Sequence, residues 1–230
     1  MQQYALETKS LSFKYNPKGP FILKDINLKL KKGEIIGIVG LSGSGKSTLI
    51  QIINGVIPKR IFGFMEGSVY LNGENVADKE LSYLAREIGT IFQDPDCQIL
   101  FPCAEDEMAF GPENLCYDPI SILTRIYETT KVLDIEPLRY RNPNTVSGGE
   151  KQIIALASVL TLNVGIMIFD ESMSFIDENG RKLIKSAIQK LKTQGKSIIM
   201  VEHDLSNLEV ADHIYLLKNG TLEVFKGVIE

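Results

Sequence analysis

Apolar and polar residues alternate through much of the first third of the chain. The segments "YALETKSLSFKY" and "FILKDINLKL" have an apolar residue at about every second position, which is typical of antiparallel strands with one solvated face. The segment "GSVYLNGENV" at 67–76 predicts a further strand and an Asn-Gly turn. By contrast, "GEIIGIVG" at 33–40 is almost continuously apolar and is followed by helical spacing in "STLIQIINGVI". This pair of segments indicates a buried parallel strand that leads into a helix.

The hydrophobic period changes to that of helices after about residue 97. "EDEMAFGPENL", "PISILTRIYETTKVLDI" and "GGEKQIIALASVLTL" have helical spacing. Beyond them, "VGIMIFDES" at 164–172 and "KSIIMVEHD" at 196–204 predict two buried strands around a helix from Glu178 to Lys192, and "HIYLLKNGTLEVF" predicts a closing hairpin. Strands that alternate with helices indicate a mostly parallel sheet covered by helices. We expect an α/β core of residues 1–96 and 161–230, with an N-terminal antiparallel β subdomain and an inserted helical subdomain at 97–160.

Charge and composition narrow the classes of function. The 230 residues include 25 basic and 29 acidic side chains, a net charge of −4, so no basic surface for nucleic acid is expected. No apolar run approaches the roughly 20 residues that span a bilayer, and the N-terminus lacks a signal-peptide core, so we expect a cytosolic chain. Cys97, Cys103 and Cys116 have no paired spacing and are expected to be reduced, partly buried thiols.

The segment "GLSGSGKST" at 40–48 carries the strongest chemical signal. It matches G-x-x-x-x-G-K-[ST] between a predicted buried strand and a predicted helix, which is the context that this motif requires. Glycines let the backbone wrap a phosphate chain, and the amide groups and helix dipole stabilise its charge. Lys46 can reach the terminal phosphates, and Ser47 can ligate Mg²⁺ from the first helical turn. The loop therefore predicts a nucleotide site of the kind that kinases, GTPases and many ATPases share.

Polar side chains at the ends of other predicted strands narrow this choice. In "IMIFDES" an apolar strand brings Asp170 and Glu171 to the carboxyl edge of the sheet, where ligands bind in open α/β sheets. Asp170 suits a magnesium role, and Glu171 could orient and polarise a water molecule for in-line attack on the γ-phosphate. His203 ends "IIMVEH" and could hydrogen-bond the γ-phosphate or the water. Gln93, after "EIGTIF", could bind Mg²⁺ or the water and move with an adjoining segment.

The segment "VSGGEKQIIALA" at 146–157 indicates a second phosphate-binding element. Ser147 and Glu150 have the spacing of a capping box that starts a helix. Gly148 and Gly149 are poor choices for stability alone, since a glycine inside a helix costs about 1 kcal/mol relative to alanine. A helix N-terminus without bulky side chains is, however, a good anion site.

With these motifs in this order, the chain resembles the nucleotide-binding subunit of ATP-binding-cassette (ABC) transporters over essentially all of its 230 residues. The resemblance implies a single ABC ATPase domain, 1–230, with a P-loop core, and a Walker B motif that ends in the catalytic glutamate. It implies catalytic roles for Lys46, Gln93, Glu171 and His203. It implies magnesium ligation by Ser47, Gln93 and Asp170. It implies ATP binding by Tyr15, which would stack on adenine, and by Gly40, Ser42, Gly43, Ser44, Gly45, Lys46, Ser47 and Thr48.

In this family two cassettes pack head to tail, and the signature helix of one faces the γ-phosphate held by the other. The resemblance therefore implies that Ser147, Gly148 and Gly149 complete the ATP site of a second chain, in a homodimer or a heterodimer. The chain also departs from the family. Ile153 stands where the family usually has arginine, and Ser172 stands where it usually has proline.

The runs "FQDPDCQILFPCAEDEMAFGPENL" at 92–115 and "NGVIPKRIFGFMEGSVYLNG" at 54–73 are similar to the ATPases of energy-coupling-factor (ECF) transporters. Those transporters take up vitamins or transition-metal ions. The resemblance implies ATP and Mg²⁺ as cofactors, a transmembrane coupling subunit and a membrane substrate-binding subunit as partners, and a peripheral place on the cytoplasmic face of the cell membrane. One alternative is a soluble ABC-type ATPase that is not linked to transport. Another is a P-loop kinase or GTPase, in which "VSGGEKQ" would have no place.

Overall fold

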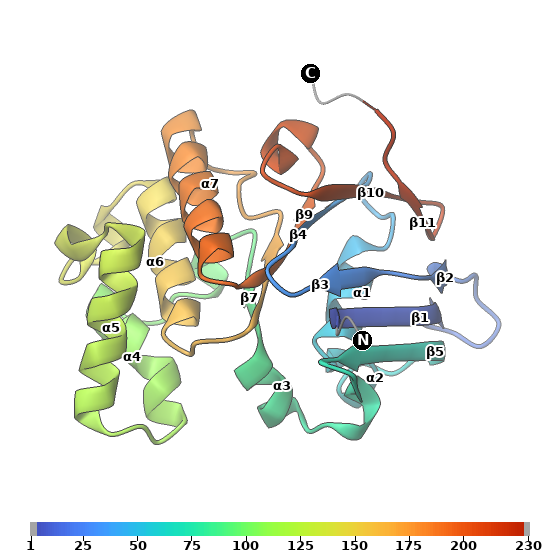
Figure 1. Ribbon diagram of the computed structural model, residues 1–230, viewed down its shortest axis with the longest axis horizontal. Coiled ribbons are helices and arrows are strands. Elements are labelled where there is room, and N and C mark those ends of the chain that lie inside the picture. Colours follow the sequence, from blue (N-terminus) through green and yellow to red (C-terminus); the bar gives the residue numbers. More distant parts are fainter. Residues whose placement is uncertain (1–3, 228–230) are drawn as a thin grey trace.

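The computed structural model describes residues 4–227 and arranges them as two β-sheets and a group of helices (Figure 1). The first sheet has the strand order β2-β1-β5-β6, with β3 also paired to β1, and all of these pairings are antiparallel. Its strands are β1 (Tyr4–Lys14), β2 (Leu23–Ile26), β3 (Lys29–Lys31), β5 (Phe64–Leu71) and β6 (Glu74–Asn75). The antiparallel β region predicted for the first third of the chain is confirmed.

The second sheet forms the centre of the molecule and has the strand order β11-β10-β4-β9-β8-β7. The pairs from β10 to β7 are all parallel, and the hairpin between β10 and β11 is antiparallel. Its strands are β4 (Ile35–Val39), β7 (Ile88–Ile91), β8 (Ile166–Asp170), β9 (Ser197–Glu202), β10 (His213–Lys218) and β11 (Thr221–Val224). The mostly parallel α/β sheet is therefore also as predicted.

Helices connect the strands of the structure. In chain order they are α1 (Lys46–Ile53), α2 (Val56–Lys59), α3 (Leu81–Glu87), α4 (Ala104–Asn114), α5 (Pro119–Leu133), α6 (Gly148–Leu160) and α7 (Glu178–Thr193). Short 3₁₀ turns are η1 (Val76–Asp78), η2 (Pro95–Cys97), η3 (Glu136–Leu138), η4 (Pro143–Thr145) and η5 (Leu205–Leu208). The helices α4 to α7 lie on the opposite side of the molecule from the antiparallel sheet (Figure 1).

The parallel strands are nearly continuous in apolar residues because both of their faces are buried. In β4, Ile36 and Ile38 belong to the core shared with the antiparallel sheet, whereas Ile35 and Val39 belong to the core under the helices. Successive side chains of a strand point to opposite faces, so one apolar strand supplies both cores. This packing fixes the strand ends, and with them the edge of the sheet that carries the candidate site.

Two further expectations concern the burial of the cysteines and the presence of membrane-spanning helices. Cys103 is half-buried, as expected, but Cys97 and Cys116 are exposed, so the expectation of partly buried thiols was wrong for these two. Cys97 ends the short turn η2 between β7 and α4, and Cys116 lies between α4 and α5, so neither belongs to a segment whose hydrophobic period reports burial. Within residues 4–227, no helix combines the length and the apolar character needed to span a bilayer.

Candidate functional site

The loop between β4 and α1 has the backbone geometry of a phosphate-binding loop. Gly43 and Gly45 have φ values of 78° and 107°, a region that side-chain-bearing residues rarely adopt. A Cβ atom on Gly40 would lie 2.6 Å from the carbonyl oxygen of Leu217 and 2.7 Å from the hydroxyl of Ser44. Three of the loop's glycines are therefore required by its conformation. Helix α1 begins directly after Gly45, so its free amide groups face the loop.

The Lys46 ammonium lies under this loop and is only 5% exposed. Its Nζ donates to the carbonyl oxygens of Gly40 at 2.7 Å and Leu41 at 3.1 Å. The same atom lies 3.2 Å from Oε1 of Glu171. A buried cation held by two carbonyls and one carboxylate is fixed in position, and it points its charge at the space that the loop encloses.

The Glu171 carboxylate is the point at which the candidate catalytic residues meet. Its Oε1 pairs with Lys46, and its Oε2 accepts a 3.4 Å hydrogen bond from Nε2 of Gln93 and lies 3.5 Å from Nδ1 of His203. Gln93, Glu171 and His203 follow the ends of the neighbouring parallel strands β7, β8 and β9, and Lys46 begins α1, which the loop joins to β4. Glu171 itself has a φ of 50°, an uncommon value for a residue with a side chain, and its amide donates to the carbonyl of Val201 at 2.8 Å. The sheet thus holds the carboxylate rigidly at its carboxyl edge.

Asp170, the last residue of β8, lies beside this carboxylate. Burial, and after it the charge of Glu171, raise the pKa of Asp170 to about 6, and the Lys46 ammonium opposes this rise. Two neighbouring carboxylates at one strand end favour a bound cation, which would reduce the repulsion between them. These carboxylates, the hydroxyl of Ser47 and the amide oxygen of Gln93 are all hard oxygen donors of the kind that Mg²⁺ prefers. The residues therefore fit a magnesium ion.

Tyr15, which follows β1 of the antiparallel sheet, contacts the first turn of α1. Its hydroxyl lies 3.0 Å from Oγ1 of Thr48, and its ring packs edge-on against Phe13 with the centroids 4.8 Å apart. The ring remains about half exposed. This arrangement places an accessible aromatic face next to the first turn of α1, where a base attached to a bound phosphate chain could stack.

The signature segment, which we define as Ser147, Gly148 and Gly149, forms the start of α6. The capping box is present: Oγ of Ser147 accepts from the amide of Glu150 at 3.2 Å, and Oε2 of Glu150 accepts from the amide of Ser147 at 2.9 Å. Hydrogen bonding from the Ser147 amide, and after it from the Ser147 hydroxyl, holds the pKa of the Glu150 carboxyl below its usual range. Ser147 and Gly148 are exposed, and no hydrogen bond or ion pair between described residues joins them to Lys46 or Glu171. Among residues 4–227, Ser147 and Gly148 therefore make no direct polar contact with the residues that meet at Glu171.

The two glycines of this segment differ in their surroundings. A Cβ atom on Gly149 would lie 2.5 Å from Cα of Gly180, so Gly149 allows α6 and α7 to approach closely. A Cβ atom on Gly148 would have 3.6 Å to its nearest neighbour, a methyl group of Ile176. Packing therefore explains Gly149, whereas it leaves Gly148 without a structural reason.

Sequence reasoning missed Glu202, which immediately precedes His203. This residue is fully buried, and its Oε2 accepts from Nδ2 of Asn207 at 3.1 Å. Burial raises the pKa of Glu202 to about 7, although Asn207 and the amide of Met173 favour its ionised form. Its Oε1 has no hydrogen-bond partner among residues 4–227. The sequence did contain a sign of this burial. Successive side chains of β9 point to opposite faces, so Glu202 lies on the same core-facing side as Ile198 and Met200.

Comparison with known proteins gives consistent results. The sequence model of the family described as "ABC transporter" matches residues 23–174. The energy-coupling factor transporter ATP-binding protein EcfA of Methanosarcina acetivorans is 36% identical over 98% of this chain and 80% of its own length. The structure of cbiO1 from Clostridium perfringens, described as part of the ABC transporter complex cbiONQ, superposes with a TM-score of 0.88 at 28% identity, over 96% of this chain and 87% of that one. The dimeric bacterial ABC transporter cassette MJ0796 gives a TM-score of 0.78 at 27% identity, over 97% and 100%.

Proposed function

This chain belongs to the family of ABC transporter ATP-binding proteins, and we propose that its Glu171-centred site hydrolyses ATP to drive an importer of the ECF type. The observation that carries this proposal is the meeting of Lys46, Gln93 and His203 on the two oxygens of the Glu171 carboxylate. A carboxylate in this position can orient a water molecule and accept its proton at the γ-phosphate end of the loop.

The residues around Glu171 divide the work of hydrolysis. The amide groups at the start of α1 and the Lys46 ammonium bind the β- and γ-phosphates, and Tyr15 stacks on the adenine. Glu171 positions the attacking water, and His203 donates a hydrogen bond on the γ-phosphate side. Ser47, Asp170 and Gln93 would hold Mg²⁺, which supplies neutralisation of the phosphate charge during transfer. ATP is the substrate in this scheme.

The proposed functional unit contains two cassettes arranged head to tail. The exposed start of α6, with Ser147 and Gly148, would bind the γ-phosphate held by the other chain. Support comes from the lack of a direct polar contact, among residues 4–227, between this segment and the residues that meet at Glu171, and from the dimeric form of the MJ0796 cassette. A γ-phosphate held between two chains would favour the closed dimer, and its hydrolysis would release it.

A direct connection between α6 and the segment around Gln93 supports coupling to partner subunits. Nε2 of Gln152 on α6 donates to the carbonyl of Phe92 at 2.8 Å, and Lys151 forms an ion pair with Asp96. The same region exposes apolar side chains, including Leu100, which is 67% exposed. We place the contact with a transmembrane coupling subunit here, at the cytoplasmic face of the membrane. A substrate-binding membrane subunit would then select the vitamin or metal ion.

The substitution Glu171→Gln tests the proposed chemistry. The amide keeps the shape of the side chain but cannot accept a proton, so steady-state ATP hydrolysis should fall at least 100-fold, within the range of general-base effects. ATP binding should persist, and the variant should form an ATP-dependent dimer in size-exclusion chromatography. Glu178→Gln is the matched control, because Glu178 is exposed and, among residues 4–227, its ion pair is with Lys182 on the same helix. Normal hydrolysis by Glu171→Gln would contradict the role assigned to Glu171.

A further inference from the structure

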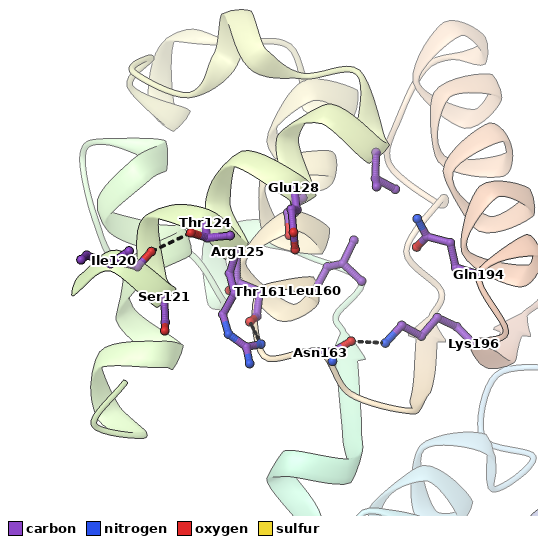
Figure 2. A pocket seen from close by; sticks show the side chains of 12 residues that line it. Ile120, Ser121, Thr124, Arg125, Glu128, Leu160, Thr161, Asn163, Gln194 and Lys196 are labelled. Carbon is purple, nitrogen blue, oxygen red and sulfur yellow. Dashed lines mark hydrogen bonds between the residues drawn. The ribbon is translucent and has the colours of Figure 1, made fainter. Parts of the chain in front are cut away.

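A second cavity, of about 420 Å³, lies away from the ATP site, between α5, the end of α6 and the turn that leads into β9 (Figure 2). Val132 and Leu160 contribute apolar side chains to its lining, and most of the other lining residues are polar. None of the residues assigned to ATP or to the signature segment lines it. Its volume is in the range of sites for small molecules.

Two cations in this cavity are held in place without a carboxylate partner. Nη1 of Arg125 donates to the carbonyl of Thr161 at 3.1 Å, and its guanidinium lies 4.4 Å from the ring centroid of Tyr117. Nζ of Lys196 donates to Oδ1 of Asn163 and to the carbonyl of Val164, both at 2.7 Å. Across residues 4–227, neither cation forms an ion pair with an acidic side chain. Their positions are therefore fixed by neutral acceptors, which leave both positive charges uncompensated.

Two lysines on the nearby helix α7 do form ion pairs with carboxylates, in contrast to Arg125 and Lys196. On α7, Lys190 pairs with Asp134 and Lys192 pairs with Asp212. Glu128 lines the cavity on the exposed side of α5, but it does not pair with either cation. Burial, followed by the charge of Arg125, lowers the pKa of Lys196. The two cations thus repel each other, and a ligand anion would relieve this repulsion.

We propose that this cavity binds a small molecule through an oxyanion, a phosphate or carboxylate group, held between Arg125 and Lys196. The guanidinium offers paired donors that suit such a group, and the amide side chains of Asn163 and Gln194 line the same cavity. Glu128 would face the part of the molecule that carries no negative charge. Because Arg125 belongs to α5 and Lys196 precedes β9, the bound anion would connect the helical subdomain to the parallel sheet.

A tryptophan reporter makes this binding measurable. The chain contains no tryptophan, and Ile120 lines the cavity while it is 78% exposed, so Ile120→Trp would place a single reporter at its mouth. Inorganic phosphate is titrated in one arm and glutarate in the other, with ionic strength held constant. A saturable fluorescence change with either probe is expected, and the tighter of the two identifies the preferred oxyanion.

Charge-removing variants on the Ile120→Trp background decide whether the fluorescence change comes from binding in the cavity. Arg125→Gln and Lys196→Gln should each weaken binding about 10-fold or more, since each removes a charge-assisted hydrogen bond. Arg60→Gln is the control, because it removes an exposed cation near α2, on the other side of the molecule (Figure 1). Lys46→Ala, which disables the phosphate loop, should leave the titration unchanged. If one cavity variant fails to fold by circular dichroism, the other decides alone.

Three results would overturn the proposal. The first is the absence of any saturable change with both probes. The second is a change that persists undiminished in Arg125→Gln and Lys196→Gln, since the cavity would then not be the source. The third is a change that disappears in Lys46→Ala, since the signal would then come from the ATP site. None of these outcomes depends on ATP hydrolysis, so failure here and failure of the ATPase assignment are distinguishable.

Discussion

At the scale of single residues, two acidic groups at the strand ends have different environments. The Glu171 carboxylate is compensated by Lys46 and lies at the surface of the site. Glu202, on the next strand, is fully buried and has one oxygen without a hydrogen-bond partner within the described chain. A buried carboxylate with few partners is stable mainly in its protonated form. Glu202 therefore makes the stability of this region depend on pH.

The direction of this dependence follows from the raised pKa. Between the usual glutamate pKa of 4.5 and the folded value of about 7, the folded chain binds more protons than the unfolded chain, so its stability falls as the pH rises. The loss approaches about 3 kcal/mol above pH 7, at about 1.4 kcal/mol for each pKa unit. Glu202→Gln resembles the protonated form, so it should lose less stability than the wild type between pH 5 and pH 8.

Denaturant unfolding of both proteins at pH 5 and pH 8 measures this difference. The free energy of unfolding of Glu202→Gln, relative to wild type, should increase by up to about 3 kcal/mol over this range. Glu209→Gln serves as the control, because Glu209 is an exposed carboxylate near the same strand end. A constant difference at the two pH values would show that Glu202 does not titrate with a raised pKa.

At the scale of elements, the start of α6 combines a packing requirement with an exposed anion-binding end. Gly149 lies against Gly180 of α7, so Gly149→Ala would push the two helices apart. Overpacking of this kind costs about 1–3 kcal/mol. Gly148→Ala meets no such obstacle and improves the helix propensity of the segment, so the stability of the monomer should not decrease.

Thermal unfolding and ATP-dependent dimerisation together separate these two roles. Gly149→Ala should lower the melting temperature of the nucleotide-free monomer, whereas Gly148→Ala should leave it equal or higher. On the Glu171→Gln background, Gly148→Ala should nevertheless reduce the ATP-dependent dimer, because a methyl group would stand at the proposed phosphate-binding end. Full ATP-dependent dimerisation of the double variant, together with full hydrolysis by Gly148→Ala alone, would show that this segment does not belong to the site.

The same elements indicate how far the sequence determines the fold and the site. The strands were predictable because each parallel strand is apolar on both faces, and the motif residues Lys46, Asp170, Glu171 and His203 could be placed because such strands end at one edge. The role of Gly149 was not accessible, since Gly180 reaches it only through the packing of α7 on α6. The juxtaposition of Arg125 and Lys196 also depends on tertiary packing, because 70 residues separate them in sequence and neither lies in a motif.

At the scale of the whole molecule, coupling requires that events at the ATP site reach a partner through the region around Gln93. The carboxylate of Glu171 contacts Gln93, and α6 contacts the residues on both sides of it, Phe92 and Asp96. The nucleotide site and the signature helix therefore share one segment. Displacement of that segment during dimer closure would also move the adjacent apolar surface, where Leu100 is exposed.

Affinity purification from detergent-solubilised membranes of the native host tests this arrangement. The tagged chain should recover polytopic membrane subunits, identified by mass spectrometry. Leu100→Glu should abolish their recovery but retain the ATP-dependent dimer on the Glu171→Gln background. Leu123→Glu, at an exposed position on α5, should retain both. Recovery of ribosomes or DNA-bound proteins without any membrane subunit would instead support an ABC-type ATPase that does not serve transport, and the negative net charge of the chain argues against that outcome.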